Sequence, residues 1–235
     1  MRAAARSEAG LVRKSNEDFF LCDPAKGLYI VADGMGGHLA GEVASQMAIK
    51  VIADYLDGAG TDHLSALKEA VTHANARIYS DSQDDLSRQG MGTTLTSAWI
   101  VGSKLYLAHV GDSRAYLIRK GSINLLTCDH SYVGELLRNG GLTEEEAQHH
   151  PRRNVLMRAV GADSEVDIDL IEVNLEPGDH LLLCTDGLFN LIPGEELLEI
   201  ILRESTLEEA VNCMVDLAYS RGAGDNLTVI LVQYP

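Results

Sequence analysis

The chain has 235 residues, of which 46% are apolar and 23% are charged, a composition typical of a globular protein with a substantial core and unlike that of a disordered chain. Its formal net charge of −16 predicts a surface that repels nucleic acids and anionic membranes, so neither is expected as a partner. No apolar run is long enough to span a membrane, and residues 1–10 lack the apolar core of a signal peptide. We therefore expect a cytoplasmic protein, most simply a monomer.

Short runs rich in Val, Ile, Leu, Thr and Tyr, bounded by turn residues, predict strands over 19–22, 28–32, 95–101, 105–110, 115–119, 166–173, 180–185 and 227–234. Apolar residues at helical spacing predict helices over 43–56 and 64–78, one after Pro193 and one over 207–220. Residues 102–104 and 111–114 resemble tight connections in an antiparallel meander. Because strands and helices do not alternate regularly, we expect an α+β fold with mostly antiparallel sheets, in a single domain over residues 1–235.

Aspartates stand beside the ends of four predicted strands, at Asp33, Asp112, Asp186 and Asp225, each next to a glycine or asparagine. If these strand ends converge, the carboxylates form a negative pocket whose mutual repulsion is relieved by a cation. Hard oxygen ligands of this kind suit Mg²⁺ or Mn²⁺. Asp-Gly steps are also common turns, so each aspartate taken alone is better interpreted as a turn residue. The spacing leaves open whether the four side chains meet.

Eight short segments spread along nearly the whole chain carry a family resemblance through their order. They are GLVRKSNED at 10–18, VADGMGGH at 31–38, GTT at 92–94, VGDSR at 110–114, TCDHS at 127–131, HPRRNVL at 150–156, TDGL at 185–188 and GDNLT at 224–228. In these segments the sequence resembles the type 2C family of metal-dependent protein serine/threonine phosphatases, in its compact bacterial form.

The resemblance implies two packed antiparallel β-sheets, a β-sandwich, flanked by helix pairs in α-β-β-α layers. It implies an enzyme that hydrolyses phosphoserine and phosphothreonine in proteins, with two Mn²⁺ or Mg²⁺ ions per chain and a weaker third. The partners would be phosphorylated proteins, including by analogy a bacterial Ser/Thr kinase that the enzyme opposes and the substrates of that kinase.

Site roles follow from the resemblance, residue by residue. Asp33 would bridge the two metals, and the backbone carbonyl of Gly34 would contact one of them. Asp186 and Asp225 would complete the other metal site. Asp112 is interpreted as structural, despite its strand-end position. Asp129 would bind a third metal that it shares with Asp186. Glu17 and Asp18 would orient metal-bound waters, and Asn226 would support the turn at Asp225.

The implied mechanism is hydrolysis by a hydroxide that the two metals share, attacking phosphorus in line without a phosphoenzyme. Arg13 would bind the phosphate through its planar set of donors; outside the GLVRKSNED context it would be interpreted as a surface arginine. His38 is a candidate general acid for the leaving alkoxide. A helix-start or substrate-contact role for His38 is an equal alternative, because many family members place the histidine where this chain has Met35.

Residues 131–160 are polar, include the pair Gly140 and Gly141, and predict a short helix near 143–148. This segment resembles the family flap beside the metal site, where mobile loops often control substrate choice. The alternative is a surface excursion without catalytic effect. Four other histidines are interpreted as structural or surface residues: His109, His130, His149 and His150.

Other classes fit less well. The four cysteines (Cys22, Cys128, Cys184 and Cys213) form no C-x-x-C pair, and none has an arginine six residues on. They are interpreted as reduced thiols, and a cysteine-based phosphatase is excluded. P-loop and EF-hand spacings are absent as well. A phosphoprotein-binding module that has lost its metals, and a metal-dependent phosphodiesterase or small-molecule phosphatase, stay open as alternatives, although the full aspartate set argues against the first.

Overall fold

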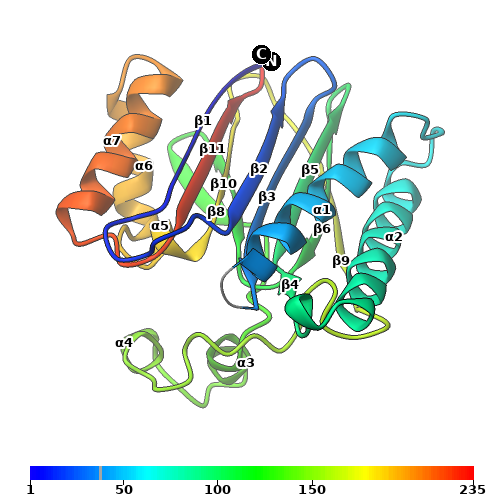
Figure 1. Cartoon of the computed structure of the whole chain (residues 1–235). Coiled ribbons are helices and arrows are strands. Elements are labelled where there is room, and N and C mark those ends of the chain that lie inside the picture. Colours follow the sequence, from blue (N-terminus) through cyan, green and yellow to red (C-terminus); the bar gives the residue numbers. More distant parts are fainter. Residues whose placement is uncertain (37–38) are drawn as a thin grey trace.

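The structure, a computed structural model, describes residues 1–36 and 39–235. Two antiparallel sheets pack face to face, and a pair of helices covers the outer face of each sheet, which gives four layers (Figure 1). The predicted α+β sandwich with flanking helix pairs is therefore confirmed. Over the described residues, no helix has both the length and the apolar composition needed to cross a membrane.

The first sheet has the strand order β1-β11-β10-β7-β8, and helices α6 and α7 pack on its outer face (Figure 1). Its strands are β1 (Arg2–Glu8), β7 (Arg114–Arg119), β8 (Ser122–Leu125), β10 (His180–Cys184) and β11 (Leu227–Gln233). The helices on this side are α5 (Asp186–Phe189), α6 (Gly194–Arg203) and α7 (Leu207–Ser220).

The second sheet has the order β2-β3-β5-β6-β9, with the short β4 paired to β3, and helices α1 and α2 cover it. Its strands are β2 (Asp18–Asp23), β3 (Leu28–Met35), β4 (Gly92–Thr93), β5 (Leu95–Val101), β6 (Lys104–Val110) and β9 (Asp169–Asn174). The helices are α1 (Leu39–Leu56), α2 (His63–Asp84) and the 3₁₀ turn η1 (Leu86–Arg88).

The central strands are buried on both faces, which explains their continuous apolar sequences. In β3, Leu28, Ile30 and Ala32 pack toward α1 and α2, whereas Tyr29 and Val31 pack into the space between the sheets. Strands β10 and β11 divide their side chains in the same way between the α6–α7 layer and the sandwich interior. Alternate side chains of each central strand therefore belong to two different cores, one under the helices and one between the sheets.

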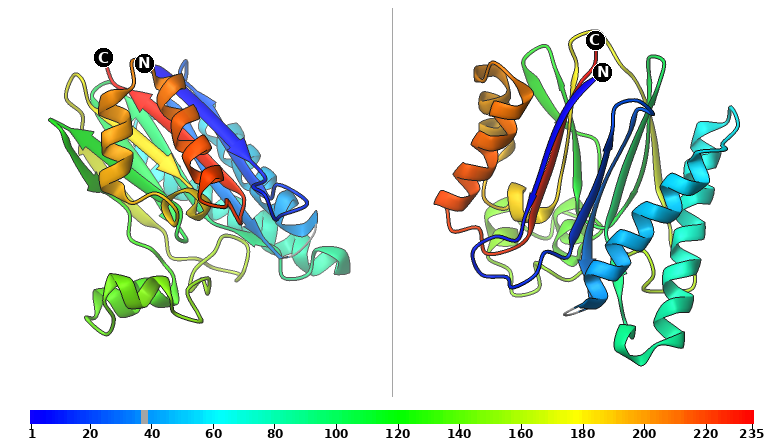
Figure 2. Two further views of the ribbon diagram at one scale, coloured as in Figure 1. Left: turned by 90° about the vertical axis from the view of Figure 1, so that its left-hand side faces the viewer. Right: turned by 45° about the horizontal axis from the view of Figure 1, so that its top comes forward.

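A lobe formed by α3 (Tyr132–Arg138) and α4 (Glu144–Gln148) lies beyond one end of the sandwich, and both chain termini lie at the opposite end (Figures 1 and 2). The backbone returns from the lobe to the sandwich through two isolated bridges, Ser131 with Leu156 and Thr93 with Val160. Helix α4 confirms the short helix predicted near 143–148. Helix α3 was not predicted.

Two parts of the predicted strand pattern are wrong. Residues 111–114 are not a hairpin turn, because β6 and β7 belong to different sheets and this segment connects them. The strand predicted over 166–173 begins only at Asp169. Strands β1, β4 and β8 were not predicted either. The sequence of β1 contains only Arg, Ala, Ser and Glu, and its pairing with β11 depends on contacts distant in the sequence.

Candidate metal centre

The strand register brings the predicted aspartates to one end of the sandwich. In the second sheet, Asp18 of β2 lies opposite Asp33 of β3. In the first sheet, Cys184 of β10 lies between Arg114 of β7 and Val229 of β11. The turns next to these positions hold the other three strand-end aspartates at the same end of that sheet: Asp112, Asp186 and Asp225.

Asp18 connects the two sheets at this end. Its Oδ2 accepts hydrogen bonds from the hydroxyls of Thr185, at 2.8 Å, and Thr228, at 2.7 Å. The side chain is 4% exposed, and its Oδ1 has no hydrogen-bond partner among the described residues. Buried polar atoms normally have partners, so an oxygen of this kind indicates a cation or an ordered water.

Thr93 and Thr94 fix the backbone of Asp33. The Asp33 amide donates to Thr94 Oγ1 at 2.9 Å, and the Asp33 carbonyl accepts from the Thr94 amide and the Thr93 hydroxyl, both at 2.9 Å. The following residue, Gly34, lies against the first turn of α1, where a Cβ would stand 2.1 Å from the carbonyl oxygen of Gly41. Glycine at position 34 is therefore required by packing, whatever its role toward a metal.

Burial and like charge raise the pKa of four carboxyl groups at this end. Burial raises the pKa of Asp18 to about 7, although hydrogen bonds from two threonines lower it. Burial and then the charge of Asp225 raise the pKa of Asp186 to about 6. For Asp33, burial followed by the charges of Asp18 and Asp186 raises the pKa well above its usual range. In each group burial is the largest cause, and the charges of neighbouring carboxylates add to it.

Asp112 belongs to the same electrostatic cluster. Burial, followed by the charges of Asp186 and Asp129, raises its pKa to about 8. The structural role that the resemblance assigns to Asp112 is therefore incomplete, because its carboxyl contributes to the negative potential around Asp33. Its position beside the end of a strand, noted in the sequence together with Asp33, Asp186 and Asp225, was the signal that pointed to it.

Asp129 is held by an arginine. Arg114 donates from Nε to Oδ1 at 3.0 Å and from Nη2 to Oδ2 at 2.7 Å. The guanidinium also stacks on Phe189, 3.9 Å from the ring centroid, in the short helix that begins at Asp186. Asp129, the predicted third-metal ligand, thus lies near the acidic cluster, but its carboxylate is already paired with the Arg114 guanidinium.

Arg13 lies in the loop between β1 and β2 with its side chain 54% exposed, and it donates from Nη2 to Oδ2 of Asp225 at 2.8 Å. The hydrogen bond and the charge of Asp225 raise its pKa, so the guanidinium is charged. The predicted phosphate ligand therefore stands in direct contact with a predicted metal ligand, and its exposure leaves it accessible to a substrate.

Glu17 and Asn226 lie at the same end. The Glu17 amide donates to Asn226 Oδ1 at 2.8 Å, and the Glu17 carbonyl accepts from the Ser45 hydroxyl at 2.7 Å and from the Gly34 amide at 3.2 Å. Asn226, predicted to support the turn at Asp225, thus contacts the preceding loop of the chain. His38 lies outside the described residues, so its predicted acid role gains no structural observation.

The donor set fits divalent cations, although the described residues contain no three His, Cys, Asp or Glu side chains already assembled as a metal site. Two of the predicted ligands, Asp129 and Asp225, are paired with arginines. Asp186 Oδ1, like Asp18 Oδ1, is buried without a hydrogen-bond partner in the described part of the chain. Unpartnered carboxylate oxygens in a crowded negative cluster are the ligands that Mg²⁺ and Mn²⁺ prefer.

The flap segment contacts this region through Asp129. Arg138 of α3 donates to the Asp129 carbonyl oxygen at 2.7 Å. The rings of His109 and His130 contact each other, with their centroids 4.8 Å apart and their planes tilted by 41°. His109 hydrogen-bonds the Thr96 hydroxyl at 2.9 Å, and burial lowers its pKa to about 4. Both histidines are buried inside the fold, in agreement with the structural role predicted for them.

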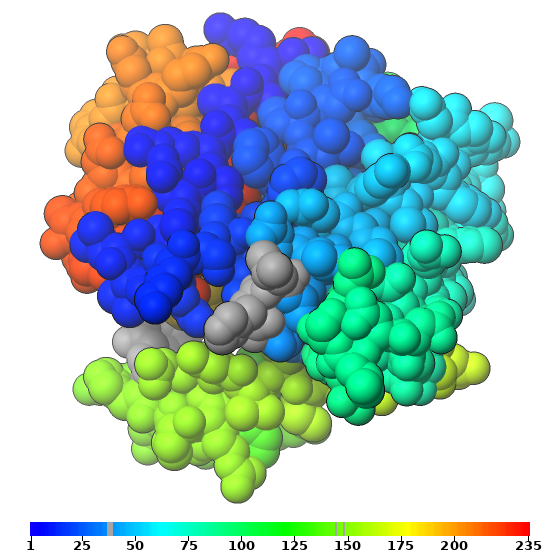
Figure 3. All heavy atoms as spheres, viewed as in Figure 1, coloured from blue at the N-terminus to red at the C-terminus, as the bar shows by residue number. Residues whose placement is uncertain are grey.

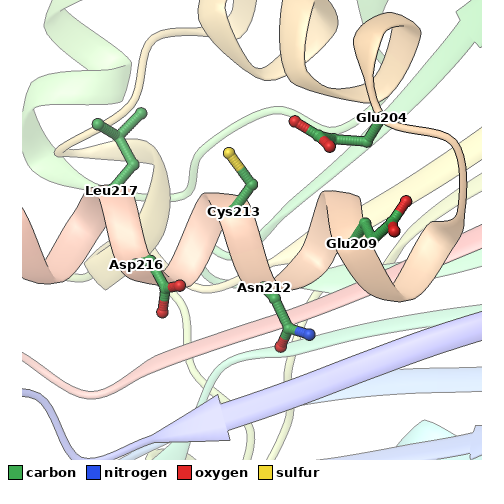
Figure 4. Close-up of a pocket in the computed structure, with 6 residues that line it drawn as sticks. All are labelled: Glu204, Glu209, Asn212, Cys213, Asp216 and Leu217. Atoms are coloured by element: carbon green, nitrogen blue, oxygen red, sulfur yellow. The ribbon is translucent and has the colours of Figure 1, made fainter.

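A separate groove is lined by residues of α7 and by Glu204, which precedes this helix (Figure 4). None of the predicted site residues belongs to its lining, which is formed by Glu204, Glu209, Asn212, Cys213, Asp216 and Leu217. The groove therefore contains none of the residues on which the predicted chemistry depends.

The sequence matches the profile of the family described as protein phosphatase 2C over residues 12–217. The chain belongs to the protein phosphatase 2C family. The serine/threonine phosphatase stp of Listeria monocytogenes serotype 4b is 40% identical over 242 residues, which cover 99% of this chain and 96% of that relative. The predicted family and enzyme class, a protein phosphatase, are confirmed.

Solved structures of 2C phosphatases match as well. The crystal structure of the Mycobacterium tuberculosis serine/threonine phosphatase PstP/Ppp has a TM-score of 0.92 and 41% identity, and the match covers 99% of this chain and 97% of that one. The catalytic domain of the serine threonine protein phosphatase PstP in complex with two manganese ions matches with a TM-score of 0.90 and 39% identity over the same shares.

Proposed function

We propose that this 2C phosphatase hydrolyses phosphoserine and phosphothreonine in proteins, with two Mn²⁺ or Mg²⁺ ions at the shared end of its two sheets. The observation that carries the proposal is the pair of buried, unpartnered oxygens, Oδ1 of Asp18 and Oδ1 of Asp186, inside a cluster of carboxyls with raised pKa values. A cation is the simplest group that stabilises both atoms and the cluster around them.

The two ions would be held by the carboxylates of Asp33, Asp186 and Asp225 and by the backbone carbonyl of Gly34. Glu17 and Asp18 would accept hydrogen bonds from waters around the ions. When bound, the ions would supply an activated water and positive charge against the phosphate.

A third, weaker cation would take Asp186 with one further carboxylate. The resemblance points to Asp129, but the bidentate Arg114 pair competes for that carboxylate. We favour Asp112, because its carboxyl is buried near the negative charges of Asp186 and Asp129, which together with burial raise its pKa to about 8.

Arg13 would bind the phosphate. Once a cation engages Asp225, the guanidinium is free to donate two parallel hydrogen bonds to phosphate oxygens, and it would offset negative charge that develops in the transition state. His38 remains the proposed general acid for the leaving alkoxide. The flap, residues 131–160, would influence which phosphoproteins reach the site, within a single catalytic domain that spans residues 1–235.

The proposed partners are phosphorylated proteins, including a bacterial Ser/Thr kinase and its substrates. A cytoplasmic location is supported by the four cysteines, all of which are free thiols. Within residues 1–36 and 39–235, no contact favours a second function.

The test is phosphate release from a phosphothreonine peptide in the presence of Mn²⁺, Mg²⁺ or EDTA, for the wild type and for Asp186→Asn. Turnover that needs either ion and largely disappears in the variant supports the proposal. A folded protein that binds the peptide without turnover would instead be a phosphoprotein-binding module. Faster hydrolysis of a phosphodiester or of a small phosphomonoester than of the peptide would identify one of the other enzyme classes.

A further inference from the structure

We infer that Asn226 is a positioning residue for Arg13: its side-chain amide fixes the loop of residues 9–17 against the turn that carries Asp225. The inference rests on the proposed function, since it assigns Arg13 to the phosphate. It differs from support of the Asp225 turn, because the contacts of the amide are made to another part of the chain.

Three hydrogen bonds carry the inference. Asn226 Nδ2 donates to the carbonyl oxygens of Ala9 and Ser15, both at 2.9 Å, and Asn226 Oδ1 accepts from the Glu17 amide at 2.8 Å. The side chain is 5% exposed. One buried amide therefore binds the loop both before and after Arg13, and uses both donor hydrogens and its acceptor on that loop.

Backbone contacts beside Asn226 also hold the loop of residues 9–17 against the turn that carries Asp225. The Leu11 amide donates to the Ala223 carbonyl at 2.7 Å. Gly10 has a φ of 75°, and a Cβ there would stand 2.3 Å from the Asp225 carbonyl oxygen, so only glycine permits this close approach. The loop thus lies directly on the 223–226 segment.

Apolar packing contributes little to holding this loop. Leu11 is 61% exposed and Val12 is 71% exposed, although both are large apolar residues. Figure 3 shows the segment between β1 and β2 at the surface, on the same face as the α3–α4 lobe. A loop with its apolar side chains in solvent depends on hydrogen bonds for its conformation, and Asn226 supplies three of them.

Asp225 and Asn226 hold Arg13 in two ways, one through its side chain and one through its loop. Asp225 contacts the Arg13 guanidinium, and Asn226 contacts the backbone of the loop that carries it. Without the amide, Arg13 would sample a wider range of positions, and the orientation that a bidentate phosphate contact requires would be populated less often. Phosphate binding would weaken more than the chemical step.

Asn75 in α2 provides a matched control. It is 2% exposed, donates to the carbonyl oxygens of Asp163 and Ser164 at 3.0 and 3.3 Å, and accepts from the Gly161 amide at 2.7 Å. The chemistry of the three bonds is the same as at Asn226, but the segment that they hold does not carry Arg13. Substitution of either asparagine removes the same number of hydrogen bonds.

The experiment compares Asn226→Ala with Asn75→Ala in two measurements. In metal-free protein, amide hydrogen exchange over residues 9–17 should be about tenfold faster in Asn226→Ala than in the wild type or Asn75→Ala. With Mn²⁺ and a phosphothreonine peptide, Asn226→Ala should raise KM about tenfold with a smaller effect on kcat. When Arg13→Ala is already present, adding Asn226→Ala should not change KM further. Asn75→Ala should leave KM unchanged.

Unchanged exchange over residues 9–17, or a KM no different from that of Asn75→Ala, would overturn the inference. If Arg13→Ala itself leaves KM unchanged while the loop still exchanges faster in Asn226→Ala, the phosphate role of Arg13 fails and the attachment of the loop stands. Should Asn226→Ala not fold, Asn226→Ser, whose short hydroxyl can replace at most part of the three bonds, gives the same two measurements with the same expected direction.

Discussion

The guanidinium of Arg114 binds both carboxylate oxygens of Asp129, with Nε 3.0 Å from Oδ1 and Nη2 2.7 Å from Oδ2. Burial disfavours the charge of Arg114, but the hydrogen bonds and charge of Asp129 raise its pKa overall, so the arginine stays charged. The pair is mostly enclosed, with side-chain exposures of 26% and 16%. Removal of one member of such a pair leaves the other without a counter-charge.

Asp129→Asn should therefore lower the free energy of unfolding by about 3 kcal/mol in metal-free protein. Asp112→Asn should not, because it removes a carboxyl that carries like-charge repulsion. Urea unfolding in EDTA measures both. If Asp129→Asn is as stable as the wild type and instead loses a weak Mn²⁺ binding step, Asp129 is the third-metal ligand, and the assignment to Asp112 is wrong.

Arg13→Lys should lower kcat/KM for a phosphothreonine peptide by about tenfold or more, mostly through KM. Lysine keeps the positive charge but cannot donate two parallel hydrogen bonds to phosphate oxygens. Steady-state kinetics with Mn²⁺ measures the change. Arg2→Lys, in β1 near the opposite end of the sandwich, is the control and should match the wild type. Equal kinetics for all three proteins would remove Arg13 from the phosphate site.

Divalent ions should stabilise the protein more as pH rises. The folded-state pKa values of Asp186, Asp18 and Asp112 are about 6, 7 and 8, above the unfolded value of 3.8. The metal-free folded state thus binds protons more tightly than the unfolded state, and this contribution to stability is lost as pH rises from about 4 through these values. Above them the carboxylates are charged and available to cations.

The measurement is the shift in unfolding temperature on addition of a fixed Mn²⁺ concentration, between pH 5 and pH 8. We expect a small shift at pH 5 and a larger one at pH 8. A shift that is constant across this range would mean that protons and Mn²⁺ do not compete for the same carboxyls.

Asp186→Asn should have opposite effects on stability and activity. In metal-free protein at pH 8 it removes a buried negative charge and should raise the free energy of unfolding by on the order of 1–3 kcal/mol. In the presence of Mn²⁺ it should lose most turnover and most of the stabilisation by the ion. Thermal unfolding and phosphate release measure the two effects, and Asp216→Asn, an exposed change on α7, is the control. A variant that is less stable without metal would show that Asp186 serves the fold.

Most strands and the positions of the strand-end aspartates were predictable because their signals are local, whereas the spacing left open whether these aspartates meet. Asp-Gly or Gly-Asp steps stand beside the ends of apolar runs, close to where the strands begin or end. Edge strand β1 was not predictable in this way, since Arg2–Glu8 has little strand propensity of its own and is held by its partner β11. The partners of Asp129 and Asn226 were not predictable either, because Arg114 and the loop of residues 9–17 reach them only through the packing of the two sheets.

The first strand of the sheet pairs with the last over its whole length, from Arg2 with Gln233 to Glu8 with Leu227. A pairing between such distant segments closes a very long loop, and contacts of this kind form slowly during folding. Asp225 and Asn226 immediately precede the last strand, so the loop of residues 9–17 gains its anchor only when that strand is in place. During synthesis on the ribosome the Arg13 loop and the acidic end of the sandwich would therefore remain unassembled until β11 has emerged, and activity would report that β1 and β11 have paired.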